Sequence, residues 1–460
     1  MKLRKKKPVR LFNSLTRKVE DYKPIKSGKT SIYTCGPTVY DHVHIGNLRT
    51  YVFEDTLRRV LKAGGYQVNH VMNITDIEDK IFARANETNQ DFKTLTAKYE
   101  KIFFEDIAKT GIDLHESKLI RASEAITDMQ ELIRQIPNKY IVDDGIYFDI
   151  GNDKDYGRFV TLDRRHEHHR INNDEYDKEQ VADFALWKAK KPSEPSWDFK
   201  IDGRNIEGRP GWHIECSAMS VKYLGQPFDI HTGGVDLMFP HHENEIAQSR
   251  AATGKKLANF FVHAEHLLVD GRKMSKSFGN FLTLENIEAK KFEPMALRLL
   301  FLQAHYRSQL NFAWESLSAA QAFLQRLRSW ADLVLQPKLG HKRTASINYQ
   351  SALKVIKHSL SEDLNTPKAL SMLSLLTIDA EAYGVDVKKL KPLLAEIDDL
   401  IGLDLSKRKD ITPEQKQLIL QREEARTSKD WSKADQMRHQ LKKQGIELND
   451  TDLGPIWYRA

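Results

Sequence analysis

The sequence predicts an α/β protein in which a parallel sheet is followed by a mainly helical region. Three observations support this prediction: a strand, helix and strand near the start, the return of this alternation after a polar stretch, and a nearly continuous helical pattern beyond residue 285. The chain has 460 residues, 40% hydrophobic and 29% charged, which is typical of a globular protein with several domains.

The first unit spans residues 30–74. Residues 30–35 are predicted to form a buried strand, and residues 45–63 a helix, because apolar residues recur there at helical spacing and two glycines follow. A second strand is predicted at 66–74. Strand, helix and strand at this spacing form a βαβ unit, whose ligand lies beyond the carboxyl ends of the strands. Cys35 and Thr75 lie at such ends.

The remaining elements follow in order. Between 116 and 205 the pattern changes to a helix, a hairpin at Asp144-Gly145 and a very polar stretch, which predicts an insertion. The α/β pattern resumes with a helix at 213–224, a strand at 228–231, a helix at 241–252 and a strand at 260–269. Helices at 294–304, 312–334, 349–360, 366–376 and 387–401 predict a bundle. Two short helices, 415–427 and 431–444, and a β-like ending complete the chain.

Composition excludes some classes of protein. The net charge of +7 and the pI of 9.0 suit a polyanionic partner, although a lysine surplus also keeps ordinary proteins in solution. No stretch is long enough to span a bilayer, and no signal-length apolar stretch follows the basic start, so we expect a cytoplasmic protein without a membrane partner. Two cysteines cannot build a disulfide framework.

Two short strings indicate phosphate chemistry. His44-Ile45-Gly46-Asn47 falls where a strand passes into a helix, and Lys273-Met274-Ser275-Lys276-Ser277 follows a strand and an Asp-Gly turn. A histidine and an amide at a helix N-terminus supply fixed donors together with the helix dipole. The two lysines add positive charge.

In this order, the strings resemble the HIGH and KMSKS signatures of the class I aminoacyl-tRNA synthetases. The resemblance implies a Rossmann-type parallel-sheet catalytic domain with an inserted connective domain, a helical bundle and a small C-terminal domain. It implies that His44, Gly46 and Asn47 bind ATP, and that Lys273 and Lys276 stabilise the transition state. Asn47 stands where the fuller motif has histidine, so it can donate but cannot carry charge.

Three further strings, 33–41 around Cys35, 211–219 around Cys216 and 239–245, resemble the cysteinyl-tRNA synthetases, which implies one Zn²⁺ per chain. The implied ligands are Cys35, Cys216, His241 and Glu245. Independently, two thiolates, an imidazole and a carboxylate make a complete zinc shell, and residues 241 and 245 share a helix face. His242 could pair with Glu245 in the same way, so the choice of histidine stays open.

The resemblance also implies that Gly36, Thr75 and Trp212 contact the amino acid. Asp236, after two glycines, is expected at the ribose hydroxyls. Three of these assignments have a plainer interpretation. Trp212 could be an ordinary core residue, Thr75 could cap a helix, and the glycines before Asp236 could form an ordinary turn.

The implied function is ATP-dependent activation of L-cysteine, with Mg²⁺ accompanying ATP, and transfer to tRNA(Cys) by a monomer. Coordination of the substrate sulfur would reject serine and alanine without editing. Basic residues interleaved with Trp431 and Trp457 predict an anticodon-binding tail. The alternatives are the cysteine ligase of mycothiol biosynthesis, which acts on an amino sugar, and a non-catalytic zinc- or RNA-binding relative.

The domain boundaries follow from this organisation. We expect the catalytic domain at 1–115 and 206–270, the insertion at 116–205, the KMSKS loop and stem-contact region at 271–311, the bundle at 312–404 and the anticodon-binding segment at 405–460.

Overall fold

The computed structural model describes residues 8–159, 169–171, 182–192, 194–274, 279–336, 346–451 and 454–459. The chain divides into two compact units. Unit 1 consists of Met1–Pro294, Ala304–Ala313 and Ser361–Leu364, and unit 2 of Met295–Gln303, Trp314–Leu360 and Asn365–Ala460. Within the described ranges, no helix has the length and apolar character needed to cross a membrane.

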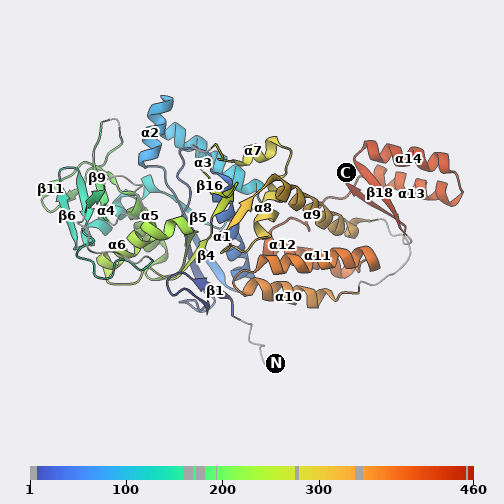
Figure 1. Ribbon diagram of the computed structural model, residues 1–460, viewed down its shortest axis with the longest axis horizontal. Helices are drawn as coiled ribbons and strands as arrows, with labels where there is room; N and C mark the ends of the chain where they lie inside the picture. The colour runs from blue at the N-terminus through green and yellow to red at the C-terminus, as the bar shows by residue number, and fades with distance from the viewer. Residues whose placement is uncertain are drawn as a thin grey trace. The chain divides into compact units, whose positions relative to one another are not determined.

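A five-stranded parallel sheet forms the centre of unit 1 (Figure 1). Its strands, in spatial order, are β14 (Ala258–Ala264), β13 (Phe228–Gly234), β3 (Lys29–Thr34), β4 (Gln67–Ile74) and β5 (Lys118–Arg121). Helix α1 (Ile45–Ala63) connects β3 to β4, which confirms the predicted βαβ unit. The strand order changes direction between β3 and β13, and ligands of such sheets bind at this switch point.

Helix α1 forms because one face of it is apolar. Leu48, Leu57 and Leu61 are completely buried, as a helix packed on a sheet requires. The helix ends at Gly64, and Gly65 continues the chain with a φ of 88°, a backbone conformation that favours glycine. Other helices of unit 1 are α2 (Asp79–Thr88), α3 (Phe92–Lys109), α4 (Ile126–Gln135), α5 (Trp212–Leu224), α6 (Glu243–Thr253) and α7 (Leu284–Ala289).

The insertion contains a separate sheet. Strands β12 (Gly208–Pro210), β9 (Ala182–Ala189), β7 (Gly145–Phe148) and β6 (Lys139–Val142) pair in this order, and β8 (His169–Ile171) joins β9. The predicted hairpin at Asp144-Gly145 is β6–β7. Two buried cations, Lys188 and Arg209, both pair with Asp79 at the start of α2, and so tie this sheet to the helix that follows β4.

Four elements differ from the predictions. Strand β5 lies inside the range predicted as insertion, yet it pairs with β4; four residues are too few for a recognisable pattern. The predicted strand 260–269 is broken into β14 and β15 (Leu267–Val269), and β15 pairs with β16 (Arg272–Lys273) and β17 (Leu310–Phe312). The helix predicted from 241 begins as a π-helical turn, η3 (Met238–His242). The hairpin of β1 (Arg10–Asn13) and β2 (Lys18–Asp21) was not predicted.

Unit 2 contains the predicted helices: α8 (Pro294–Leu302), α9 (Trp314–Asp332), α10 (Tyr349–Ser361), α11 (Thr366–Tyr383) and α12 (Val387–Ile401). Toward the C-terminus, α13 (Pro413–Thr427) and α14 (Trp431–Lys443) lie side by side with the hairpin of β18 (Ile446–Thr451) and β19 (Gly454–Arg459) (Figure 1). This segment has its own core, formed by Ile411, Ile419, Leu441, Ile446, Leu448 and Trp457.

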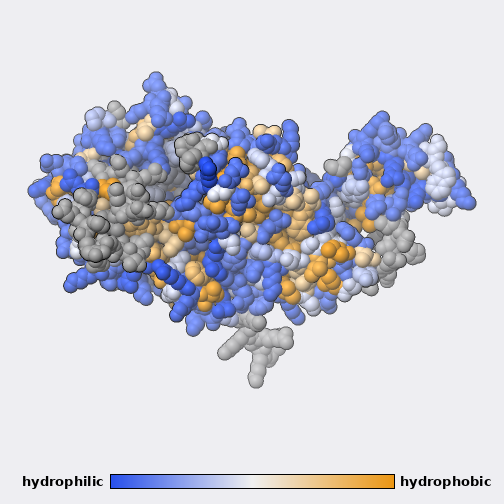
Figure 2. All heavy atoms as spheres, viewed as in Figure 1, coloured by the Kyte–Doolittle hydropathy of each residue, from blue (hydrophilic) through white to orange (hydrophobic). Residues whose placement is uncertain are grey.

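The two tryptophans expected to stack on RNA bases have different environments. Trp457 is 0% exposed in this core, so the expectation is wrong for Trp457, whose ring is fully occupied by packing. Trp431, at the start of α14, is 59% exposed. The face of α13 and α14 that is seen in Figure 2 is mostly hydrophilic.

We expect Trp457→Ala to destabilise the C-terminal segment by about 3–5 kcal/mol, because it removes the largest side chain of a small core. Trp431→Ala is the matched control and should change stability by less than about 0.5 kcal/mol. Hydrogen exchange of the β18–β19 amides in the full chain measures both. Equal protection in the two variants would contradict the assigned core.

Candidate metal centre and nucleotide site

The first motif, residues 44–47, caps the N-terminus of α1. Nδ1 of His44 accepts hydrogen bonds from the backbone N–H groups of Gly46 (3.1 Å) and Asn47 (3.2 Å). In return, Oδ1 of Asn47 accepts the backbone N–H of His44 at 3.1 Å, which completes a capping box. Because Nδ1 is an acceptor, the proton of the neutral ring resides on Nε2, which is then a donor.

Burial keeps this imidazole uncharged. Desolvation lowers the pKa of His44 from 6.5 to about 4, although the carboxylate of Asp236 acts in the opposite direction. At neutral pH His44 is therefore a neutral donor. Asp236 itself lies exposed in the turn η2 (Val235–Leu237) after β13, so its charge is near the start of α1, at the same edge of the sheet.

The segments that flank the second motif contact the first. His44 forms a β-bridge with Thr283, and its ring meets the ring of Phe281 edge to face at a centroid distance of 5.4 Å. Within the second motif, Cε of Met274 would lie 2.7 Å from a Cβ at position 46, and the His44 ring atoms Cε1 and Nδ1 would lie 2.9 Å from it, so a side chain at position 46 would displace both residues. The two motifs, far apart in sequence, thus meet at the start of α1.

The two predicted lysines cannot both be located. Lys273 lies exposed in β16, directly before Met274. Lys276 belongs to residues 275–278, which lie outside the described residues.

A buried arginine that sequence reasoning did not single out stabilises this arrangement. Arg49, 3% exposed on α1, donates to the backbone carbonyls of Glu265 (2.9 Å), His266 (2.7 Å), His305 (3.2 Å) and Ser308 (2.5 Å). These carbonyls precede β15, which pairs with the strand of Lys273, and β17, which pairs with the other edge of β15. The available signal was a cation on the apolar face of the predicted helix.

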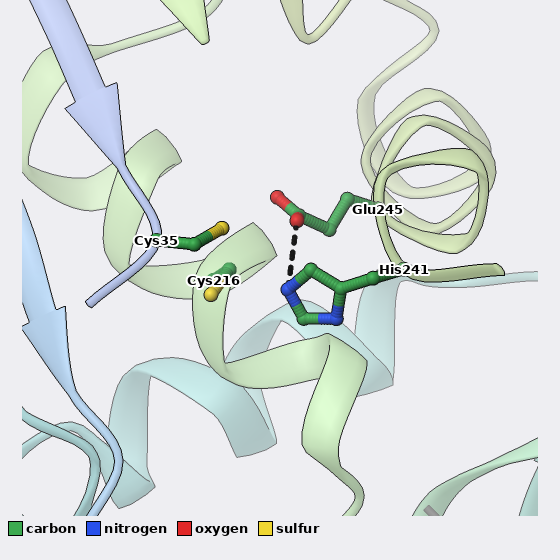
Figure 3. Close-up of side chains that lie close together, drawn as sticks. All are labelled: Cys35, Cys216, His241 and Glu245. Atoms are coloured by element: carbon green, nitrogen blue, oxygen red, sulfur yellow. Dashed lines mark ion pairs between the residues drawn. The ribbon is translucent and has the colours of Figure 1, made fainter. Parts of the chain in front are cut away.

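Four side chains predicted as metal ligands converge in the structure (Figure 3). Cys35 follows β3, Cys216 lies on α5, His241 in the turn η3 and Glu245 in the first turn of α6. One potential ligand atom from each lies within 4.8 Å of the others. Nε2 of His241 is 3.1 Å from Oε1 of Glu245.

A second ligand set shares two of these residues. His231 and His242, together with Cys35 and Glu245, also bring their ligand atoms within 4.8 Å of one another. Nε2 of His242 is 3.4 Å from the Cys35 sulfur, and Nε2 of His231 is 2.8 Å from Oε2 of Glu245. Both histidines that the sequence left open, His241 and His242, therefore reach the centre.

The second ring nitrogen of His241 and that of His242 each contact a further histidine. Nδ1 of His241 lies 2.9 Å from Nδ1 of His213, and Nδ1 of His242 lies 2.8 Å from Nε2 of His263. Partners of this kind fix the tautomer and orientation of a metal-binding imidazole.

The electrostatics of this centre suit a divalent cation. Burial raises the pKa of the Cys35 and Cys216 thiols and lowers the pKa of His241 to about 3. Without a cation the thiols are protonated, whereas a bound dication would stabilise thiolates and release protons. Two sulfurs, an imidazole and a carboxylate within this span fit the donor preferences of Zn²⁺.

The residues expected to contact the amino acid surround the same centre. The ring of Trp212, half-buried, stacks on the ring of His241 at 4.3 Å. The N–H of Gly36 donates to Oδ1 of Asn73 at 2.9 Å, and a Cβ at position 36 would lie 1.7 Å from the Asn73 carbonyl oxygen. Thr75 does not cap α2, since that cap is Glu78.

Comparison with known proteins agrees with this architecture. Residues 21–322 match a family model described as the tRNA synthetases class I (C) catalytic domain. The chain is 41% identical to a cysteine–tRNA ligase of Brachyspira hyodysenteriae over 98% of this chain and 100% of that protein. It is 39% identical to one of Chlamydia muridarum (96% and 98% covered) and 37% identical to one of Thermococcus onnurineus (98% and 99%).

Solved structures share the fold. The methionyl-tRNA synthetase of Mycobacterium tuberculosis bound by methionyl-adenylate has a TM-score of 0.54 at 13% identity, covering 82% of this chain and 89% of that one. The LeuRS of Agrobacterium radiobacter K84, in a ternary complex, has a TM-score of 0.58 at 12% identity, covering 85% and 86%. At these identities the likeness concerns the fold alone, and the fold predicted from the sequence is confirmed.

The capping geometry of His44 leads to a prediction with a matched pair of variants. Asparagine is a good N-cap, so His44→Asn should keep α1 stable while it removes the Nε2 donor and slows phosphate chemistry by about 10²-fold or more. His44→Ala should lose the donor and also about 1 kcal/mol of stability. Denaturant unfolding and single-turnover rates separate the two effects.

The same geometry fixes a pH dependence. Because the pKa of His44 is about 4, its Nδ1 should remain an acceptor from pH 8 to pH 6, and the capped position of the ring should persist over that range. A rate loss in wild type that follows an imidazole pKa near 6.5 and disappears in His44→Asn would contradict the neutral-donor assignment.

Proposed function

Because the chain belongs to the cysteine–tRNA ligases, a family of class I tRNA synthetases, we propose that it activates L-cysteine with ATP and transfers the cysteinyl group to tRNA(Cys). The observation that supports the choice of amino acid is the convergence of Cys35, Cys216, His241 and Glu245 at the edge of the sheet where α1 begins.

In the proposed first step, a carboxylate oxygen of cysteine attacks the α-phosphorus of ATP, and the bond to the leaving pyrophosphate breaks. The attacking group is already an anion, so the step requires no general base and depends on positioning and on stabilisation of phosphate charge. We assign the Nε2–H of His44 and the side-chain Nδ2 of Asn47 as donors to the nucleotide, Gly46 as the residue that leaves room for it, and Asp236 as the acceptor for ribose hydroxyls. Lys273 and Lys276 would neutralise the leaving side, with Mg²⁺ accompanying ATP.

We assign Cys35, Cys216, His241 and Glu245 as the ligands of one Zn²⁺. This set uses both thiols, the softest donors available, whereas the alternative set uses one. Bound there, Zn²⁺ would supply a coordination position for a soft sulfur ligand. Three anionic ligands would leave the loaded centre with a net charge of about −1, which disfavours hard ligands such as the hydroxyl of serine.

In this assignment His231 has a supporting role. Its Nε2 binds the oxygen of Glu245 that faces away from His241, and so orients that carboxylate. Trp212, stacked on His241, and Gly36 would form walls of the amino-acid pocket.

We assign Trp431 and nearby exposed cations as contacts for the anticodon loop. Among the basic residues of the tail, Arg408 and Arg459 both pair with Asp332, and Arg422, 3% exposed, pairs with Asp450. Because these three arginines are engaged in ion pairs, we assign them structural roles. Lys429, Lys433 and Lys443 are exposed on the same segment as Trp431, a combination suited to a single-stranded RNA loop.

The two alternatives from the sequence have less support. The relatives named cysteine–tRNA ligases match 98% of this chain, tail included, which favours a tRNA substrate over an amino sugar. A non-catalytic relative is less favoured because both phosphate-handling strings are intact in the sequence, and Lys273 is exposed directly before Met274, whose side chain approaches Gly46. Monomeric state and cytoplasmic location stay predictions.

The proposed activity has a direct test. The purified, zinc-loaded chain should exchange label between pyrophosphate and ATP with L-cysteine, and not with serine or alanine, and should then charge tRNA(Cys). Exchange across all twenty amino acids is the control. Exchange without charging would favour the amino-sugar ligase, and no exchange with any amino acid would favour the non-catalytic relative.

The ligand assignment predicts unequal effects of two neighbouring histidines. Cys216→Ser and His241→Gln should each lower the bound zinc and raise the KM for cysteine by about tenfold or more, with a much smaller change for ATP. His242→Gln should retain close to one equivalent of zinc. Metal analysis decides: loss of zinc from His242→Gln with retention in Cys216→Ser would favour the second ligand set.

A further inference from the structure

A chain of three hydrogen bonds links the segments that carry the two cysteines. The backbone N–H of Gly36 donates to Oδ1 of Asn73 at 2.9 Å, Nδ2 of Asn73 donates to Oγ1 of Thr75 at 3.1 Å, and Oγ1 of Thr75 donates to Oε2 of Glu215 at 2.9 Å. Gly36 directly follows Cys35, and Glu215 directly precedes Cys216.

The direction of each bond in this chain is determined. A backbone N–H can only donate, so Gly36 fixes the amide of Asn73 with its oxygen toward Gly36 and its NH₂ toward Thr75. The Thr75 oxygen must accept from that NH₂, and its single proton goes to the carboxylate of Glu215. The Thr75 hydroxyl therefore has one remaining lone pair and no remaining proton.

These groups lie where electrostatic interactions are strong. Asn73, Thr75 and Glu215 are 2%, 1% and 0% exposed, so the charge of the carboxylate is poorly screened by water.

We propose that Glu215 is a positioning residue for the amino-acid substrate: by taking the proton of Thr75, it makes Oγ1 of Thr75 an acceptor for the α-ammonium group of cysteine. An ammonium group has three donors and no acceptor, so it matches the remaining lone pair. The carboxylate behind Thr75 adds a negative charge without occupying the pocket. This inference rests on the proposed function and deepens it, because it assigns how the end of the substrate opposite the sulfur is recognised.

The test uses the full-length, zinc-loaded protein with Glu215→Gln, which conserves shape and removes the charge. The KM for cysteine in pyrophosphate exchange should rise by about tenfold or more, the range for a lost hydrogen bond to a charged group, while the KM for ATP and the zinc content stay unchanged. Two competitive inhibitors then separate recognition from folding. Binding of cysteamine, which has the ammonium but no carboxylate, should weaken in parallel with cysteine, and binding of 3-mercaptopropionate, which has no amino group, should not.

A matched control and a double variant complete the design. Asp229→Asn neutralises another buried carboxylate, one that accepts the backbone N–H groups of Ile25 and Ser31, and should leave the ratio of the two inhibition constants unchanged. Thr75→Val should reproduce the selective loss of cysteamine. Adding Glu215→Gln to Thr75→Val should cost little more, because both act through one hydroxyl.

Several results would overturn the proposal. A parallel weakening of both inhibitors, or loss of zinc from Glu215→Gln, would show that Glu215 only supports the fold. An unchanged KM for cysteine would show that it has no part in recognition. If wild type itself gave no cysteine-dependent exchange, the proposed function would fail, an outcome separate from failure of Glu215→Gln.

Discussion

The parallel pairing of β3 with β4 on one side and β13 on the other is the constraint on which the rest of this molecule depends. In register, Thr34 is opposite Met72 and Thr232, so the three strands end at one edge. Cys35, Thr75 and Asp236 lie in the segments that follow these strands, although Asp236 comes about 200 residues after Cys35. Antiparallel pairing would send such segments to opposite edges of the sheet. Helix α1 begins at the same edge, so the capped N-terminus at His44 and the segment that carries Cys35 lie at one edge of the sheet.

Gathering so many polar groups in the interior has a cost that the hydrogen bonds offset. His231, His241, His242 and Glu245 are at most 1% exposed, and burial lowers the pKa of His241 to about 3. Burial also lowers the pKa of His242 and raises the pKa of the Cys35 and Cys216 thiols, so His241 and His242 remain neutral and a cation is required before both thiols can be ionised. The same burial makes direction matter, because a buried hydroxyl that must donate to a carboxylate cannot also donate to a ligand. Burial therefore determines which groups of this network can still accept a hydrogen bond from a ligand.

Features determined by residues close together in the sequence were predicted well, and features determined by distant residues were not. Helices α1 and α12 have the bounds predicted from local periodicity and glycine stops. The four metal-ligand candidates followed from residue type and family resemblance, but two adjacent histidines of the same chemistry both reach the centre, so no sequence pattern could choose between them. Arg49 was missed because its acceptors lie more than 200 residues away, and Trp457 was misjudged because nothing local distinguishes a tryptophan that packs from one that stacks.

The asparagine at position 47 has a consequence for how α1 presents its N-terminus. The backbone N–H groups of Gly46 and Asn47 are already bonded to Nδ1 of His44, so these two amides cannot bind a phosphate directly. The imidazole accepts these two N–H groups at Nδ1, and its Nε2 carries the proton of the neutral ring. Asn47 holds the backbone of His44 through Oδ1, which a protonated histidine in its place could not do, since both nitrogens of an imidazolium are donors. The structure thus gives this motif a neutral imidazole whose position is fixed by hydrogen bonds at both ends of the capping box.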